Sequence, residues 1–285
     1  MMHSIPSPRL SIVIVTFNSR THIDQCLASL VQHPPRVGCE IVVVDNCSPD
    51  GTAATIRARW RDVPVIEAGD NLGFARANNL GIRRTSGELI LLLNPDTIVP
   101  PHAIDALVAA IDARPDVAIT GPRLVDDQGH AELSFGAMMS PFTELRQKAL
   151  VRGNDRGIGA IRAYVDHATR HAHEVDWVSG ACLLVRRTDA EMVGLMDERY
   201  FMYAEDVDFC AAVRAKGRRV LFAPFAEVVH LRGKSRASAD SAVEHAYHRS
   251  HVAFYEKHHP AWAPVLRLYL KLRGRLPDTS TGGGE

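Results

Sequence analysis

The segment Glu88–Leu93 followed by Asn94-Pro95-Asp96 constrains the fold of this chain more than any other feature. An unbroken aliphatic run follows Glu88, and such a run is typical of a parallel strand that is buried on both faces. The strand delivers an amide and a carboxylate at its carboxyl end, where ligands bind in open α/β sheets. The sequence therefore predicts an α/β fold with a binding site at residues 94–96.

Strands and helices alternate along the first third of the chain. The predicted strands are 10–15, 40–45, 63–67 and 88–94. Three helices are predicted between them: one that Asn18 or Ser19 caps, one from Thr52 to about Trp60, and one at 74–85. This alternation predicts a doubly wound parallel sheet with right-handed crossovers.

The remainder of the chain has a weaker pattern. We predict strands at 117–124, 181–185 and 219–223, and helices at 205–216, 237–258 and 262–272. Residues 150–174 are rich in Gly, Arg and His and carry little periodicity. We therefore predict a long functional loop there.

The composition excludes several classes of protein. Lys+Arg and Asp+Glu both number 33, so a global basic field for nucleic acid is absent. Five cysteines without a C-x-x-C pair argue against a disulfide framework or a cysteine zinc site, and fit a reducing compartment. No apolar run approaches the ~20 residues of a membrane span, and the N-terminus lacks a signal-peptide core. We expect a cytoplasmic protein.

Two other loops at the predicted carboxyl edge carry residue types that bind ligands. Asp45 ends a strand, and its carboxylate can accept the imide N–H of uracil or thymine; a carboxylate that caps the local turn is equally consistent. Gly73 precedes a helix, where it permits close backbone approach to an anion, although it also serves simply to make the turn. Arg76 and Asn78 are candidates to face a diphosphate.

Asp96 is the best candidate for a metal ligand. Mg²⁺ and Mn²⁺ favour one or two carboxylates together with phosphate oxygens and water. Pro95 fixes the backbone so that Asn94 and Asp96 can face the same mouth of the sheet. The alternative is that Asp96 caps a helix that begins near Pro100.

The acids at the start of the helix 205–216 are candidates for catalysis, although acids in a first turn also favour the helix dipole. Asp206 precedes Phe209 by three residues and shares its inward face, whereas Asp208 is turned away. An inward carboxylate must be paired or functional. We therefore predict that Asp206, with Glu205 beside it, is the general base.

His230 ends an apolar strand. A histidine in that position is more often structural. Because Arg232 and Lys234 follow it, His230 is also a candidate for binding phosphate.

Taken together, these segments resemble family 2 glycosyltransferases with the GT-A fold, an α/β fold with a Rossmann-like, mostly parallel sheet flanked by helices, here with C-terminal helices. The matching stretches are 11–18, 43–52, 71–79, 93–96, 178–181 and 203–209, in that order. Asn-Pro-Asp at 94–96, Glu-Asp-x-Asp at 205–208 and His-x-x-Gly-x-Ser at 230–235 resemble the rhamnosyltransferase-like branch.

The resemblance implies an inverting transfer from a nucleotide diphosphate sugar to a glycan or polyprenyl-linked acceptor in cell-surface polysaccharide synthesis. It implies catalytic Asp206 and Glu205, nucleotide-binding Thr16, Asn18, Asp45, Ser48, Gly73, Asn78 and Asn94, and Asp96 and His230 as ligands of Mg²⁺ or Mn²⁺. Asn94 replaces the usual first aspartate of the family, which removes one formal charge from the metal site.

The resemblance places a catalytic domain at 9–235, and the sequence pattern predicts a C-terminal helical extension at 236–276 and a disordered tail at 277–285. Within the catalytic domain, 9–100 is the nucleotide-binding half and 101–235 the acceptor half.

The donor follows partly from Asp45, because cytosine lacks the imide N–H and a purine is too large for a site of the same depth. A pyrimidine nucleotide is therefore expected, and the resemblance favours dTDP-rhamnose. A UDP-hexose donor is an alternative. An alternative to the glycosyltransferase activity itself is a sugar-phosphate nucleotidyltransferase. Such an enzyme usually has a glycine-rich phosphate loop after the first strand, and residues 16–20 contain no glycine.

The segment 262–273 predicts a basic helix with an apolar stripe of Trp262, Val265, Leu266 and Tyr269. Basic amphipathic helices lie at membrane interfaces and attract anionic lipids. Peripheral contact with the inner membrane face and packing on the catalytic domain are equally consistent with this pattern.

Overall fold

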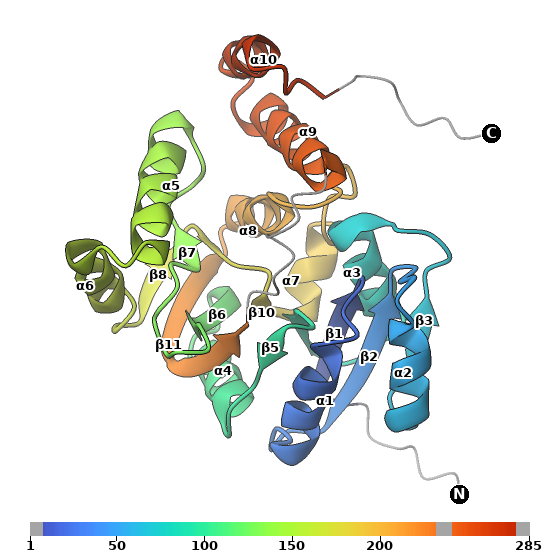
Figure 1. Cartoon of the computed structure of the whole chain (residues 1–285). Helices are drawn as coiled ribbons and strands as arrows, with labels where there is room; N and C mark the ends of the chain where they lie inside the picture. The colour runs from blue at the N-terminus through green and yellow to red at the C-terminus, as the bar shows by residue number, and fades with distance from the viewer. Residues whose placement is uncertain (1–7, 232–240, 278–285) are drawn as a thin grey trace, which may run out of the picture.

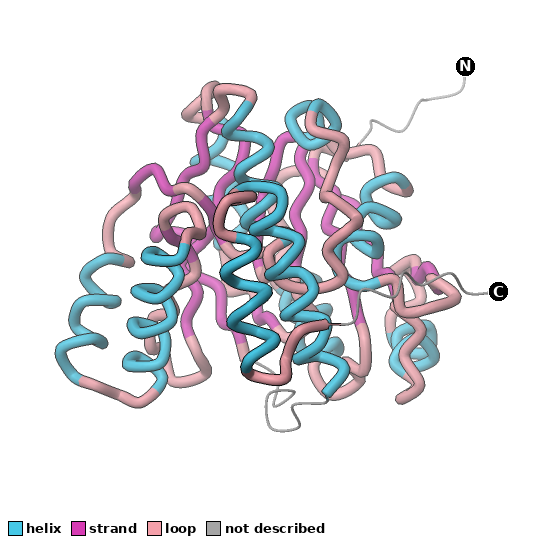
Figure 2. The backbone as a smooth tube through the Cα atoms, turned by 90° about the horizontal axis from the view of Figure 1, so that it is seen from above, coloured by secondary structure: helices cyan, strands magenta, loops and turns pink. Residues whose placement is uncertain are grey.

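The structure is a computed structural model that describes residues 8–231 and 241–277. Its centre is a nine-stranded sheet in the order β3-β2-β1-β4-β10-β6-β11-β5, with β8 paired to β11. Seen from above, strands cross the middle of the molecule and helices lie on either side (Figure 2). The strands are β1 Leu10–Thr16, β2 Cys39–Asp45, β3 Val65–Glu67, β4 Leu89–Leu93, β5 Thr97–Ile98, β6 Val117–Val125, β8 His173–Val175, β10 Cys182–Arg186 and β11 Arg219–His230.

The helices and one small sheet surround these strands (Figure 1). Strands β7 Phe135–Gly136 and β9 Trp177–Val178 form the small antiparallel sheet. The helices are α1 Ile23–Gln32, α2 Thr52–Arg59, α3 Gly73–Arg83, α4 Ala103–Asp112, α5 Pro141–Asp155, α6 Gly159–Ala168, α7 Arg187–Met192, α8 Glu205–Ala215, α9 Ser241–His258 and α10 Ala263–Leu272. Within residues 8–231 and 241–277, no helix combines the length and the apolar character that crossing a bilayer requires.

The parallel N-terminal strands are confirmed. β1 pairs in parallel with β2 and β4, and β2 pairs in parallel with β3. β10 departs from this pattern because it runs antiparallel to both β4 and β6. The two faces of the sheet carry separate cores, one against α1 and α4 and the other against α3 and α8. Every residue of β1 and β4 is buried, which explains their aliphatic runs.

The prediction of a long loop at 150–174 is wrong, because most of that segment belongs to α5 and α6. Ser140 caps α5 through a capping box with Thr143, and Pro141 occupies the first turn. The two helices approach so closely that a Cβ on Gly153 would lie 2.1 Å from Ile161 Cδ1. Within these two helices only Gly153 and Val165 are buried, so burial imposes few apolar positions on the sequence.

Two local predictions also need correction. α1 begins at Ile23 and its N-cap is His22, not Asn18 or Ser19. Asp208 is not turned toward solvent, because it is 1% exposed.

Asp208 anchors the C-terminal helices instead. It accepts hydrogen bonds from Lys257 Nζ at 2.9 Å and from Tyr200 Oη at 3.2 Å, and His258 Nε2 lies 2.6 Å from its Oδ1. These contacts hold α9 against α8.

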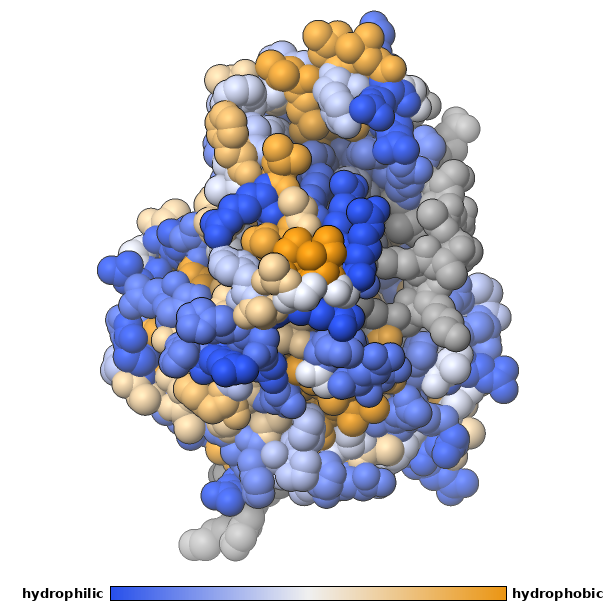
Figure 3. Space-filling model, turned by 60° about the vertical axis from the view of Figure 1, so that its left-hand side comes forward, coloured by the Kyte–Doolittle hydropathy of each residue, from blue (hydrophilic) through white to orange (hydrophobic). Residues whose placement is uncertain are grey.

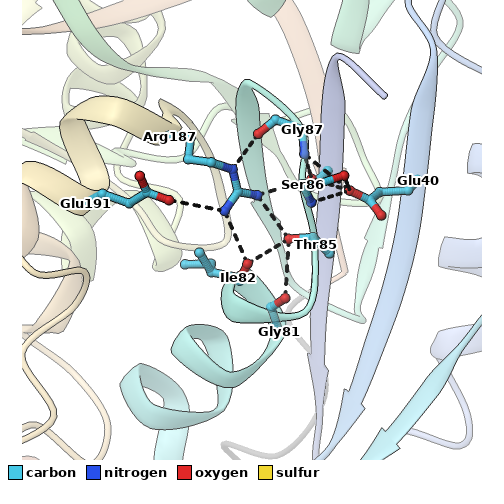
Figure 4. Close-up of polar contacts among 9 residues, drawn as sticks. Glu40, Gly81, Ile82, Thr85, Ser86, Gly87, Arg187 and Glu191 are labelled. Atoms are coloured by element: carbon cyan, nitrogen blue, oxygen red, sulfur yellow. Dashed lines mark hydrogen bonds and ion pairs between the residues drawn. The ribbon is translucent and has the colours of Figure 1, made fainter. Parts of the chain in front are cut away.

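A network around Arg187 joins the amino ends of the central strands (Figure 4). The guanidinium donates to Gly87 O at 2.6 Å, Thr85 Oγ1 at 3.1 Å and Ile82 O at 3.2 Å. Glu40 on β2 accepts from the backbone of Ser86 at 2.7 Å. This network ties the loop before β4 to β2 and to the start of α7 at the amino edge of the sheet.

Candidate active site

A cavity of about 230 Å³ opens at the carboxyl edge of the sheet. Its walls come from the ends of β1, β2 and β4 and from the start of α3, and amide side chains dominate its polar lining. The lining residues are Val15, Phe17, Asn18, Ser19, His22, Asn46, Asn71, Gly73, Phe74, Asn94, Pro95, Asp96 and Met202. Asn94 and Asp96 therefore face the same cavity, as their spacing predicts, and Asn18 and Gly73 join them.

Four predicted nucleotide-binding residues meet beside this cavity. Thr16 Oγ1 donates to Asp45 Oδ1 at 3.0 Å, and the Ser48 amide donates to Asp45 Oδ2 at 3.0 Å. The amide of Asn18 donates to Ser48 Oγ at 3.1 Å. Asp45 is 3% exposed. Its carboxylate thus makes the turn-capping contacts of the simpler interpretation, and its contact with a nucleobase stays a prediction.

Asn46 is a residue of the cavity to which the sequence assigned no role. Its Nδ2 donates to Asn71 Oδ1 at 2.8 Å and to Gly73 O at 3.2 Å, and its Oδ1 accepts from the Leu72 amide at 2.8 Å. This side chain clamps the loop after β2 to the loop before α3. In the sequence, only its position directly after Asp45 could have indicated that Asn46 lies at the cavity.

Gly73 is required by a protein contact as well as by its place at the cavity. Its φ is +79°, and a Cβ there would lie 2.3 Å from Phe201 O. The next amide, that of Phe74, donates to the same oxygen at 2.6 Å. The glycine therefore allows the segment before α8 to approach α3.

The structure does not bring Asn78 or Arg76 to the cavity. Asn78 is 1% exposed, and its Nδ2 donates to Phe74 O at 3.0 Å within α3. Arg76 is exposed and lies 3.5 Å from Glu198 Oε2. Their predicted contacts with a donor remain without geometric support. Arg232 and Lys234 lie outside the described residues.

Asp96 and His230 come together at the end of β11. His230 Nε2 lies 3.5 Å from Asp96 Oδ1, and His230 Nδ1 lies 3.2 Å from Glu132 Oε2. Burial lowers the pKa of His230, but hydrogen bonds and charge from the two carboxylates outweigh this effect and raise it to about 9. Asp96 does not cap α4, whose N-cap is His102. Glu132 was missed because its surroundings carry no sequence pattern.

The donor set of Asp96 and His230 fits a divalent metal that also binds a diphosphate, with the metal displacing the Nε2 proton that the raised pKa of His230 favours. Among residues 8–231 and 241–277, no group of three or more His, Cys, Asp or Glu side chains is arranged to hold a metal by itself. Phosphate oxygens and water would therefore complete the coordination shell, which Mg²⁺ and Mn²⁺ accept readily. Glu132 lies next to Nδ1, the ring nitrogen of His230 that points away from Asp96. Histidines that ligate metals commonly have such a carboxylate on their other ring nitrogen.

Asp206 lies in the first turn of α8, next to the wall of the cavity. Its Oδ2 accepts from the Gly180 amide at 2.9 Å and its Oδ1 from the Val207 amide at 2.8 Å. A Cβ on Gly180 would lie 3.4 Å from Asp206 Cβ and 3.3 Å from Phe74 Cε1, so Asp206 is close to a residue that lines the cavity. Burial raises the pKa of Asp206, whereas these backbone hydrogen bonds oppose the rise.

Glu205 is 6% exposed, and its Oε2 has no hydrogen-bond partner among the described residues. Burial, and then the charge of Asp206, raise the pKa of Glu205 well above its usual value. These effects favour the neutral form of Glu205, whereas the two backbone amides that donate to Asp206 favour its carboxylate form and make it the better candidate to accept a proton.

Comparison with known proteins identifies the family. The profile of glycosyl transferase family 2 matches residues 11–168. The chain belongs to this family. A curated relative of this family 2 glycosyltransferase is the N-acetylglucosaminyl-diphospho-decaprenol L-rhamnosyltransferase of Mycobacterium tuberculosis, 32% identical over 293 residues that cover 94% of this chain and 92% of the relative. The rhamnosyltransferase WbbL of Escherichia coli is 25% identical over 171 residues, covering 57% of this chain and 62% of WbbL.

Solved structures show the fold. The mannosyltransferase PcManGT from Pyrobaculum calidifontis, in complex with GDP-Man and Mn²⁺, has a TM-score of 0.59 at 19% identity and covers 93% of this chain and 70% of its own. GalNAc-T7 with UDP, GalNAc and Mn²⁺ has a TM-score of 0.57 at 17% identity and covers 80% of this chain and 44% of its own. The predicted GT-A fold and glycosyltransferase activity are confirmed, and the nucleotidyltransferase alternative loses its support.

Proposed function

We propose that this family 2 glycosyltransferase transfers rhamnose, with inversion, from dTDP-rhamnose to a lipid-linked glycan acceptor in cell-surface glycan synthesis. The observation that carries the proposal is the position of Asp206 near Phe74, which lines the same cavity as Asp96. A base and an anchor for the leaving group thus lie at one mouth of the sheet. The rhamnosyltransferase relative, which matches nearly the whole chain, supports the choice of sugar.

Asp206 serves this reaction as the base. Inversion at the anomeric carbon is one in-line displacement: the acceptor oxygen bonds to carbon as the carbon–oxygen bond to the diphosphate breaks, and the acceptor proton passes to Asp206. The amides of Gly180 and Val207 fix the carboxylate. Its raised pKa makes it a stronger base, and a positioned base contributes roughly 10²–10⁴-fold.

Asp96 and His230 would hold the divalent metal. When bound, the metal neutralises the charge that develops on the departing diphosphate. Glu132 keeps the Nε2 atom of His230 directed toward Asp96. The replacement of the usual first aspartate by Asn94 lowers the negative charge of the cavity, which leaves Asp96 as the acid in its lining.

The choice of base in the donor rests on the loop around Asp45. Each oxygen of its carboxylate accepts one hydrogen bond from the protein and retains a further lone pair for an imide N–H. The solved neighbours contain GDP-Man in one case and UDP in the other, so the fold alone does not select the base. Thymidine is preferred because of the rhamnosyltransferase relatives, and a UDP-hexose is the competing donor.

The test is a competition between dTDP-rhamnose, a UDP-hexose and GDP-mannose for binding and donor hydrolysis, with Mn²⁺ present. We expect a clear preference for dTDP-rhamnose and product of inverted anomeric configuration by NMR. A preference for a UDP-hexose would overturn the choice of rhamnose, and a preference for GDP-mannose would also overturn the role of Asp45. Product with retained configuration would refute the single displacement.

A further inference from the structure

Helix α10 presents apolar side chains on two of its faces. Ala263, Leu266 and Leu270 face inward, where Ala263 and Leu266 join the cluster that packs α10 on α8 and α9. A second set remains exposed: Trp262 at 45%, Val265 at 55%, Leu268 at 58%, Tyr269 at 52% and Leu272 at 80%. The prediction of one apolar stripe is therefore corrected: Leu266 faces inward, whereas Trp262, Val265 and Tyr269 face outward.

Helix α5 continues the exposed set, although it lies over a hundred residues earlier in the chain. Phe142 is 76% exposed and Leu145 is 71% exposed. The rings of Phe142 and Trp262 meet edge to face with centroids 6.4 Å apart. We call the exposed side chains of Phe142, Leu145, Trp262, Val265, Leu268, Tyr269 and Leu272 the α5–α10 face. Figure 3 shows hydrophobic side chains gathered at the α10 end of the molecule.

Cations border this face. Four basic residues and no acid lie between Trp262 and Pro277, in a chain whose formal net charge is zero: Arg267, Lys271, Arg273 and Arg275. Arg267 is paired with Glu256 and Arg275 with Glu244, so Lys271 and Arg273 carry the argument for a basic border. Lys271 is exposed, and the Arg273 guanidinium lies 5.4 Å from the centre of the Tyr269 ring. An apolar face with a basic border and interfacial aromatic residues is suited to anionic lipid. Two copies of this chain that met through the same face would bring their cations together.

Packing and hydrogen bonds join this face to the catalytic domain, and α9 lies between α10 and α8 (Figure 1). Glu144 of α5 accepts from Tyr255 Oη at 2.9 Å and lies 2.9 Å from His251 Nε2, which joins α5 to α9. Tyr255 and Ala263 share a buried cluster with Val207 of the catalytic helix. A surface bound to α5 and α10 would therefore keep a fixed position relative to Asp206.

We infer that the α5–α10 face docks the enzyme on an anionic lipid surface, with the exposed side of α10 lying in the interface. The inference relies on the proposed function only for its biological purpose, since a lipid-linked acceptor would be presented at such a surface. Flotation with vesicles, in the absence of sugar nucleotide and acceptor, tests the docking independently of the reaction.

The vesicles contain either equal parts of phosphatidylcholine and phosphatidylglycerol or phosphatidylcholine alone. We expect the full chain to float with the anionic vesicles and much less with the neutral ones. Val265→Asp should lower the partition coefficient by about tenfold or more, because it places a charge in the interface. Val31→Asp is the matched control, since Val31 on α1 is also 55% exposed and lies outside the face. Lys271→Glu should lower partition by about fivefold or more, and Lys216→Glu should not.

Circular dichroism and thermal melting of each variant establish that it is folded. Equal flotation of Val265→Asp and Val31→Asp would overturn the inference. The inference would also be overturned if the parent chain did not float and sedimentation instead showed a dimer that Val265→Asp dissociates. Donor binding by the same preparations, measured separately, reports on the proposed function, so either idea can fail alone.

Discussion

Glu132 holds the imidazole of His230 through one ring nitrogen, with Oε2 3.2 Å from Nδ1. The other nitrogen, Nε2, is thereby directed to Asp96. Glu132 and His230 come from segments 98 residues apart, and both side chains are largely buried, at 8% and 16% exposure. The pair defines which nitrogen of His230 is available to a metal or a diphosphate.

Glu132→Gln should therefore weaken metal binding, since a partner that orients a ligating histidine is worth about 10–100-fold in metal affinity. Calorimetric titration of the dTDP-bound protein with Mn²⁺ measures this affinity. Affinity for dTDP without metal should be unchanged. Wild-type Mn²⁺ affinity in the Gln variant would show that Glu132 does not position His230.

Asp96→Ala should abolish the increase in donor affinity that a metal produces, because it removes the carboxylate that lines the cavity beside His230. Asn94→Ala should weaken that increase less, because a neutral amide is a poorer ligand for Mg²⁺ or Mn²⁺ than a carboxylate. Binding of dTDP-rhamnose with and without Mn²⁺ compares the two variants. Full turnover in excess chelator would contradict the assignment of a metal to Asp96.

Asp206→Asn should lower transfer by about 10²–10⁴-fold while donor affinity stays near that of the parent. The amide keeps the size of the side chain and loses the basic oxygen. Glu205→Gln, one residue away, should retain most of the transfer rate, because burial and the charge of Asp206 raise the pKa of Glu205 and already favour its neutral form. Normal turnover by Asp206→Asn would move the role of the base to another acid.

Asp208→Ala should lower the free energy of unfolding by about 3 kcal/mol, since it removes the buried carboxylate that Lys257 and His258 contact. Chemical denaturation monitored by tryptophan fluorescence measures the change. Asp206→Asn in the same helix should change stability much less. If the two variants were equally stable, Asp208 would not anchor α9.

Acid should weaken the attachment of α5 to α9 through Glu144. Burial raises the pKa of Glu144, but His251 and Lys148 outweigh this effect and lower it from 4.5 to about 2. A depressed carboxyl pKa contributes stability above pH 4.5 that is lost as the pH falls toward 2. The loss should be about 3 kcal/mol. Denaturation at a series of pH values tests this, and Glu144→Gln should flatten the dependence.

The sequence alone determined the parallel half of the sheet and the edge at which the site lies. β1 and β4 are buried on both faces, so their aliphatic runs identify them without knowledge of their neighbours. Parallel strands end at one edge, and therefore the residues that follow β1, β2 and β4, among them Asn18 and Asp96, were expected together before any contact was known. Helical spacing did not separate Asp206 from Asp208, because Asp208 is buried as well.

Only the tertiary structure decided the contacts between distant segments. Glu132 lies in a stretch without periodicity, and its role exists only because the end of β11 places His230 beside it. Asn78 has the residue type of a ligand contact, yet its amide bonds within α3. The outward direction of Val265 and the inward direction of Leu266 depend on where α10 packs. A sequence pattern reports which side chains share a face, but which face is covered is set by residues far away in the chain.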